Sequence, residues 1–324
     1  MTEHFCTYFD HRYLSRALVL YDSLARHFGD FTLRALCLDE AAEAGVASLG
    51  LDSMTALSLT ELEQADPDVL AVKPTRSTVE YYFTWSPALP RAIFAKEPSI
   101  ERLTYLDADL YFLSSPAAVF DEIGDAPVAI VPHRFPDDQP ELLDWGRFNV
   151  GWATFTRSAT GSAVLDWWRE RCIEWCYDQV EGDRYADQKY LDRWPELFPE
   201  THVVTHPGAN LAPWNVRRHR LSEQGGQLQA DGVDVVFFHV QGLRHLARGV
   251  YRLGLDSYGV AASRLLRRTV YRPYVDELVA ADARCRSVLP SEEADAIRAT
   301  GPALVREYLR SLRYRDLMRV RSIT

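Results

Sequence analysis

The sequence predicts an α/β protein whose mostly parallel central sheet is flanked by helices and followed by a C-terminal helical extension. Three observations lead to this prediction. Short apolar runs alternate with helical patterns over the first hundred residues, which is typical of repeated strand–helix units. A pair of carboxylates follows a short apolar run, where open α/β sheets carry their binding sites. The 324 residues, 47% of them hydrophobic, are sufficient to bury a large core.

Four short apolar segments in the first third of the chain are predicted strands. Asp10 stands at an N-cap position after the first of them, and apolar residues follow it at helical spacing. Ser58 and Ser77 each precede a glutamate by three residues, a capping-box signature that predicts the start of a helix. The strands are expected at residues 4–9, 31–38, 54–57 and 103–106.

The rest of the chain adds strands at 126–131, 149–156 and 235–238 and a long helix at 159–177. Trp167, Trp168 and Trp175 on that helix indicate a packing face rather than a ligand site. Mixed Arg and Leu residues after Gly259 suggest further helices. We therefore expect a main domain of residues 1–258 and a helical appendage of residues 259–324.

The composition limits the partners and the cellular setting. A formal net charge of -10 argues against a general affinity for nucleic acid. Residues 261–324 are locally basic, with 13 Arg against 8 Asp and Glu, which would suit an anionic membrane surface, a partner subunit or simply a solvated helical face. Five cysteines without a C-x-x-C pair favour a reducing, cytoplasmic setting, and Cys172 and Cys176 are expected to be buried thiols rather than half of a metal site. No segment approaches the ~20 apolar residues of a membrane span.

The carboxylate pair is Asp107 and Asp109, and its apolar surroundings make it informative. Two like charges at a strand end need a cation to offset their repulsion. Oxygen ligands favour Mg²⁺ or Mn²⁺, which can bind a diphosphate. Another Asp-x-Asp triplet, residues 66–68, has the composition of an ordinary polar loop. His239 ends a predicted apolar strand, where its ring would bind either a metal or the backbone.

The stretch Tyr-Leu-Asp-Ala-Asp-Leu-Tyr-Phe at 105–112 resembles the D-x-D strand of the GT-A nucleotide-sugar glycosyltransferases, especially the family that includes glycogenin and the bacterial lipopolysaccharide galactosyltransferases. Five further segments resemble motifs of that family in the same order: residues 6–10, Phe-Asn-Val-Gly at 148–151, Asp-Gln at 187–188, Leu-Ala-Pro-Trp-Asn at 211–215 and His-Val-Gln-Gly at 239–242. The resemblance covers about residues 4–250 and implies a GT-A Rossmann-like fold.

The resemblance also implies roles for individual residues. Asp107, Asp109 and His239 would bind the metal, and Asn149, Asp187 and Gln188 would contact the donor sugar near the reacting carbon. Asp187 could alternatively be a helix cap. The segments expected to line the nucleotide diphosphate contain Thr7, Tyr8, Asp10, Leu106, Asp107, Ala108, Asp109, Gly242 and His245.

One departure concerns the diphosphate. The family has a Lys three residues after the glycine of the last motif, where this chain has His245. His245, Arg244 or Arg248 could replace it, since an Arg fork matches phosphate oxygens. Arg76 is a further candidate, although it could equally be a solvated loop residue.

The resemblance implies a metal-dependent glycosyltransferase that moves a sugar from a nucleotide diphosphate, with a UDP-sugar favoured, to a hydroxyl acceptor with retention of configuration. Two alternatives remain: a binding protein of the same fold without turnover, and a nucleotidyltransferase. The second is disfavoured because residues 7–16 contain no glycine for a phosphate-binding loop.

Overall fold

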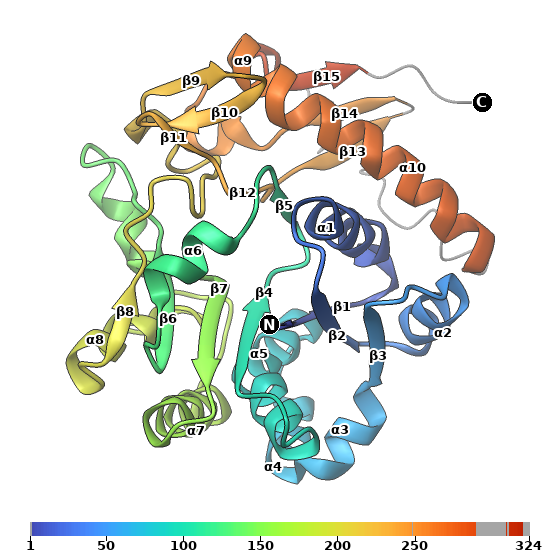
Figure 1. The fold of residues 1–324 in the computed structure, drawn as a ribbon, viewed down its shortest axis with the longest axis vertical. Helices are drawn as coiled ribbons and strands as arrows, with labels where there is room; N and C mark the ends of the chain where they lie inside the picture. Colours follow the sequence, from blue (N-terminus) through green and yellow to red (C-terminus); the bar gives the residue numbers. More distant parts are fainter. Residues whose placement is uncertain (1, 248, 290–308, 310, 320–324) are drawn as a thin grey trace.

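A seven-stranded sheet forms the centre of the molecule in a computed structural model that describes residues 2–247, 249–289, 309 and 311–319 (Figure 1). Its strand order is β3-β2-β1-β4-β7-β6-β8. Every strand is parallel to the others except β7, which runs antiparallel to both neighbours. The strands are β1 (Glu3–Phe9), β2 (Phe31–Cys37), β3 (Met54–Ser58), β4 (Arg102–Leu106), β6 (Val128–Pro132), β7 (Phe148–Thr156) and β8 (Thr201–Val203). The predicted mostly parallel α/β sheet is confirmed.

Helices cover both faces of the sheet, because successive side chains of a strand point to opposite sides. On β1, for example, Phe5 belongs to one buried apolar cluster and Cys6 to the other. The first cluster includes α1 (Leu14–His27), α2 (Glu40–Leu49), α6 (Ala117–Ile123) and α10 (Arg272–Val288). The second includes α3 (Leu59–Ala65), α4 (Pro67–Val72), α5 (Thr78–Lys96), α7 (Ala159–Glu174) and α8 (Trp194–Leu197).

Asp10, Ser58 and Ser77 all stand at N-cap positions as predicted, and the differences concern the capping bond of Ser58 and residues 66–68. Ser77 and Glu80 form both hydrogen bonds of a capping box at α5. Ser58 stands at the N-cap of α3, yet its side chain makes no capping bond. Residues 66–68, read as a polar loop, instead begin α4: the Asp66 carboxylate accepts from the Val69 N–H, and Pro67 occupies the first turn.

Three small sheets lie beside the central one. The first consists of β9 (Leu221–Gln224), β10 (Gln227–Ala230) and β11 (Val233–Asp234). The second pairs β5 (Leu110–Phe112) with β12 (Phe237–His239). The third consists of β13 (Arg244–Ala247), β14 (Val250–Arg252) and β15 (Leu317–Arg319). The expected C-terminal helix is present as α10, which packs on α1 after the short α9 (Arg264–Leu266). β15 was not expected. The boundary at residue 258 stays a prediction.

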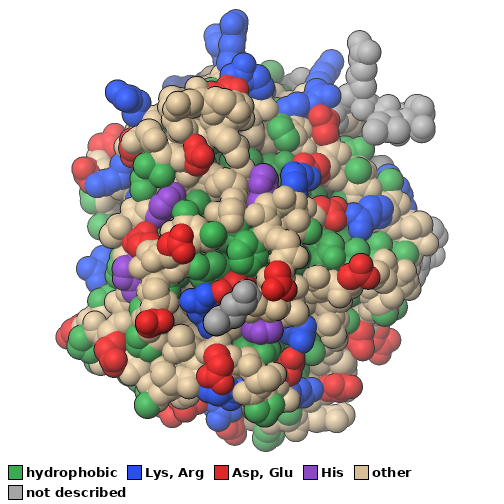
Figure 2. Space-filling model, viewed as in Figure 1, with side chains coloured by type: hydrophobic (Ala, Val, Ile, Leu, Met, Phe, Trp, Pro, Cys, Tyr) green, Lys and Arg blue, Asp and Glu red, His purple; other side chains and the backbone are tan. Residues whose placement is uncertain are grey.

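The aromatic and sulfur residues are buried as the sequence indicates. Trp168 and Trp175 lie in the core and Trp167 packs against it, although α7 ends at Glu174, before the predicted limit of 177. All five cysteines are buried free thiols. Among the described helices, none is both long and apolar enough to cross a membrane. Acidic and basic side chains are interspersed over the face shown in Figure 2.

Candidate active site

Asp107, Asp109 and His239 come together at the carboxyl end of β4. The chain turns between β4 and β5, where the Leu110 N–H donates to the Asp107 carbonyl. β12 pairs antiparallel with β5, and His239 lies opposite Leu110. One ligand atom from each of the three side chains lies within 4.8 Å of the others. The predicted metal ligands, which are far apart in the sequence, therefore form one cluster.

The hydrogen bonds of the His239 ring direct one nitrogen at the carboxylates. Nδ1 lies 3.1 Å from the Asn149 amide oxygen, which also accepts from the Gly151 N–H. An amide oxygen only accepts, so Nδ1 carries the hydrogen. In the neutral ring the lone pair is then on Nε2, which lies 3.0 Å from Asp109 Oδ1 and 3.6 Å from Asp107 Oδ2. Two carboxylates and an imidazole oriented in this way fit a divalent ion.

The charges within the cluster are unevenly shared. Burial raises the pKa of Asp107, and the neighbouring Asp109 charge adds to this effect. Burial also opposes ionisation of Asp109, but His239 and Arg16 outweigh it, so that the pKa of Asp109 is lowered. For His239, burial is outweighed by the two carboxylates, and its pKa is raised. A bound cation would relieve the repulsion between the two aspartates.

Gly151 allows this close approach. A Cβ atom at this position would lie 2.5 Å from Asn149 Oδ1 and 3.0 Å from Nδ1 of His239. Both atoms belong to the pair that orients the imidazole. The glycine of the Phe-Asn-Val-Gly segment is therefore required for space rather than for an unusual backbone angle.

Asn149 also connects the metal cluster to the Asp187–Gln188 pair. Its amide nitrogen donates to Gln188 Oε1 at 3.1 Å, and Gln188 Nε2 donates to the Trp145 carbonyl. Asp187 is buried, and this burial, with a smaller contribution from the Asp107 charge, raises its pKa to about 7. The three predicted sugar-contacting residues thus lie next to the metal cluster, and Asp187 is not at the N-cap of a described helix.

The end of β1 contributes Thr7, Tyr8 and Asp10. The Tyr8 hydroxyl lies 3.1 Å from the Ser86 hydroxyl, and its ring is 5.6 Å from that of Tyr105. Tyr105 in turn donates to Asp107 Oδ1 at 2.8 Å. Asp10 accepts from the Arg12 N–H, and burial and the Asp39 charge raise its pKa. Buried Leu106 and Ala108 flank Asp107 in the chain.

The predicted cationic contacts have other partners. Arg76 donates to the Thr84 hydroxyl and to the carbonyls of Ile173 and Cys176, which holds it against the end of α7. The His245 ring stacks on Tyr251 at 4.6 Å. Gly242 occupies a turn with a φ of 82°. The predicted contact of Arg76 with a diphosphate stays a prediction, and Arg248 lies outside the described residues.

Two aromatic residues lie close to the cluster: Trp214 belongs to the Leu-Ala-Pro-Trp-Asn segment already noted, whereas His133 was not singled out from the sequence. His133 stacks on Phe135 at 4.4 Å, and its Nε2 lies 3.4 Å from Asn149 Nδ2. Burial lowers the pKa of His133 to about 3, so it is neutral at physiological pH. The Trp214 ring is 5.1 Å from that of His239. The position of His133 directly after a predicted strand, within a His-Arg-Phe segment, was the available signal.

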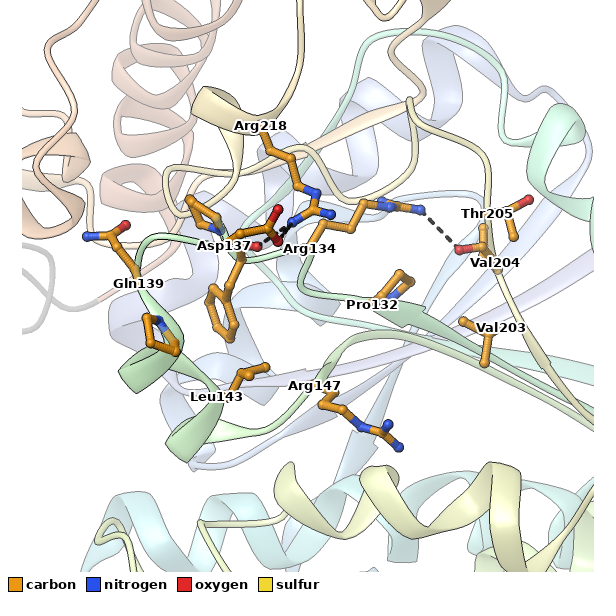
Figure 3. Close-up of a pocket in the computed structure, with 13 residues that line it drawn as sticks. Pro132, Arg134, Asp137, Gln139, Leu143, Arg147, Val203, Val204, Thr205 and Arg218 are labelled. Carbon is orange, nitrogen blue, oxygen red and sulfur yellow. Dashed lines mark hydrogen bonds and ion pairs between the residues drawn. The ribbon is translucent and has the colours of Figure 1, made fainter.

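A pocket of 650 Å³ lies beside this region, and no residue of the metal cluster lines it. Pro132 and Arg134 line the pocket, whereas His133 between them contacts Asn149. Figure 3 shows Arg218 paired with Asp137 and Arg134 directed at Val204.

Comparison with known proteins supplies relatives and a fold. YfnF of Bacillus subtilis (strain 168), an uncharacterized protein, is 32% identical over 252 residues, or 75% of this chain and 82% of YfnF. YfnD, an uncharacterized protein of the same organism, is 29% identical over 280 residues, or 85% of this chain and 88% of YfnD. No protein-family model matches.

Two solved structures have a similar fold. The galactosyltransferase LgtC, in complex with donor and acceptor sugar analogues, has a TM-score of 0.54 and 15% identity over 89% of this chain and 98% of LgtC. Mouse xyloside xylosyltransferase 1, in its apo form, has a TM-score of 0.50 and 15% identity over 75% of this chain and 98% of its own. The chain therefore belongs to the family of Bacillus subtilis YfnF and has the fold of the GT-A glycosyltransferases.

Proposed function

We propose that the protein is a metal-dependent glycosyltransferase that moves a sugar from a nucleotide diphosphate donor, with a UDP-sugar favoured, to a hydroxyl acceptor with retention of configuration. The cluster of Asp107, Asp109 and His239 at the end of β4 is the observation that carries this proposal. Its donor set suits Mn²⁺ or Mg²⁺. The similarity of the fold to a galactosyltransferase and a xylosyltransferase supports the same reaction class.

The residues around the cluster have distinct roles in this proposal. Asp107, Asp109 and His239 hold the ion, which supplies positive charge for the diphosphate. Thr7, Tyr8 and Asp10 line the nucleotide site at the end of β1. Asn149, Asp187 and Gln188 contact the donor sugar. Asn149 hydrogen-bonds to both His239 and Gln188, so it would keep the sugar-binding residues in register with the metal ligands.

The setting that we propose is cytoplasmic. All five cysteines are free and buried, which is the pattern of a protein that folds in a reducing compartment.

Thermal unfolding with UDP, GDP, dTDP and CDP, each with and without Mn²⁺, tests donor binding. A nucleotide that binds only the folded state raises the unfolding temperature. We expect UDP to do so only with Mn²⁺, and Asp109→Asn to abolish the effect. Asp68→Asn is the matched control, because Asp68 belongs to the other Asp-x-Asp triplet and its side chain is 73% exposed.

Turnover is tested separately with UDP-glucose and UDP-galactose as donors. An enzyme of this class releases UDP slowly in the presence of Mn²⁺ when water replaces the acceptor. A protein that bound UDP with Mn²⁺ but released none from either donor would instead be a binding protein of this fold. No stabilisation by any of the four nucleotides would contradict the proposal as a whole.

A further inference from the structure

Arg16 is a buried cation that forms no ion pair with any residue that the structure describes. It lies on α1 between Leu14 and Leu18 of the core and is 7% exposed. Its guanidinium donates to the Leu243 carbonyl at 3.1 Å and lies over the Tyr13 ring at 4.6 Å. Across the described residues, no carboxylate lies within 4.0 Å of it. A buried charge of this kind is costly unless a partner compensates for it.

Most of its hydrogen-bonding capacity is unused. A guanidinium has five N–H donors in a rigid fork, and within the described part of the chain this one makes a single hydrogen bond, to the Leu243 carbonyl. None of its nitrogens is among the fully buried polar atoms without a partner. The remaining N–H groups are therefore not completely sealed from solvent, although Arg16 as a whole is buried.

The position of Arg16 puts this capacity beside the metal cluster. The Leu243 carbonyl, which accepts from Arg16, belongs to the segment that follows His239. In the same segment the Val240 N–H donates to the Asp109 carbonyl at 3.0 Å. Arg16 is therefore attached to a segment that begins at one predicted metal ligand and is hydrogen-bonded to another.

The proposed reaction requires a cation at this place. A nucleoside diphosphate has more negative charge than one divalent ion shared with two aspartates can neutralise. His245, which stands where the glycosyltransferases that the motifs resemble have a lysine, stacks on Tyr251. Arg76 is bound to carbonyls at the end of α7. A second cation from another part of the fold would complete the site.

We propose that Arg16 binds the β-phosphate of the nucleotide donor. This inference rests on the proposed function, because it assumes a nucleoside diphosphate at the metal cluster. The fork of the guanidinium matches two phosphate oxygens, and the bond to Leu243 holds it in place. The ligand, rather than a protein carboxylate, then supplies the missing counter-charge.

Titration calorimetry with UDP and UMP in Mn²⁺ tests this role in three variants. A charge-assisted hydrogen bond contributes about 1.5–3 kcal/mol, so we expect Arg16→Gln to weaken UDP binding by roughly 10- to 100-fold. UMP lacks the β-phosphate, and its affinity should change by less than about threefold. Arg16→Lys keeps the charge, so its affinity for UDP should lie between those of the unmodified protein and Arg16→Gln. Arg26→Gln is the control, because it removes the same charge from the same helix where Arg26 pairs with Glu277 at the surface.

Mn²⁺ binding without nucleotide separates this role from a structural one. Removing a positive charge near Asp109 should leave Mn²⁺ affinity unchanged or raise it, whereas a damaged site would lose affinity. The inference would be overturned if Arg16→Gln bound UDP with the affinity of the unmodified protein. It would also be overturned if the variant lost affinity for UDP and UMP equally. If Arg16→Gln fails to fold, Arg16→Lys decides by the same UDP and UMP comparison. An unmodified protein that binds neither nucleotide would contradict the proposed function and this inference together.

Discussion

Asp187→Asn should make the protein more stable at alkaline pH and leave its stability unchanged at acidic pH. Burial raises the pKa of Asp187 from 3.8 to about 7. Below pH 4 the carboxyl is protonated in both the folded and the unfolded chain, and it contributes no difference. Between pH 4 and pH 7 the unfolded chain ionises first, so the free energy of unfolding falls as pH rises. Above pH 7 the full cost of ionising the buried Asp187 carboxyl lowers the free energy of unfolding.

The shift sets the size of the effect. At about 1.4 kcal/mol per pKa unit, ionising Asp187 costs roughly 4 kcal/mol at pH 8.5. A chain of this length has an unfolding entropy of roughly 0.7 kcal/mol/K, so Asp187→Asn should raise the unfolding temperature by about 6 °C at pH 8.5. At pH 4 the two proteins should unfold together.

Differential scanning calorimetry from pH 4 to pH 8.5 measures this difference. Asp183→Asn, an exposed residue four positions earlier, should show no such pH dependence. An Asp187→Asn effect of equal size at both ends of the range would refute the reasoning, because it would show that Asp187 does not change protonation on folding. The stabilised variant should also lose turnover, as is common when a buried active-site charge is removed.

Three further results are expected. Gly151→Ala should abolish the Mn²⁺-dependent stabilisation by UDP, because its Cβ would lie 2.5 Å from the Asn149 oxygen that orients His239; retained stabilisation would show that the imidazole needs no such support. Ser77→Ala should lower the free energy of unfolding by about 1 kcal/mol, because Ser77 forms a capping hydrogen bond. Ser58 forms none, so Ser58→Ala should lower it by less than about 0.5 kcal/mol. Equal losses of the two variants in urea unfolding would contradict this expectation. Arg169→Met should destabilise the protein more at pH 7 than at pH 3. Arg169 lowers the pKa of Asp66 although burial raises it, and protonation of Asp66 at low pH removes the charge that needs a partner. A loss of stability in urea unfolding that is independent of pH would contradict the ion-pair explanation.

The local signals in the sequence were sufficient for six of the seven strands of the central sheet, whereas β8 was not predicted. β1 to β4 begin and end within one residue of the predicted ranges, because each is an apolar run bounded by polar or capping residues. A local motif did not by itself determine whether a capping hydrogen bond forms. Ser58 and Ser77 carry the same motif, and only the packed structure shows which one forms the bond.

The candidate site was predicted from motifs rather than from local patterns. Asp107 and Asp109 stand out in their apolar surroundings, but the place of His239 depends on the register of β12 against β5. The environments of Arg76 and Arg16 depend on residues that are distant in the sequence. Arg76 is surrounded by polar residues in the sequence, yet it is bound to carbonyls about a hundred residues away. Arg16 interrupts an apolar helix face, which was a signal that went unused.

The pairing of β5 with β12 has a consequence for how the site arises during folding. Asp109 and His239 are 130 positions apart, and bringing two such distant points together costs loop-closure entropy. The backbone hydrogen bonds between β5 and β12 offset this entropy without a ligand. They run from the pair Phe112 and Phe237 to the pair Leu110 and His239. A metal ion that binds at this cluster would therefore meet ligands that are already close together. Insertions in exposed loops between residues 112 and 237, away from Asn149 and Gly151, should therefore leave metal affinity unchanged as long as these two strands stay paired.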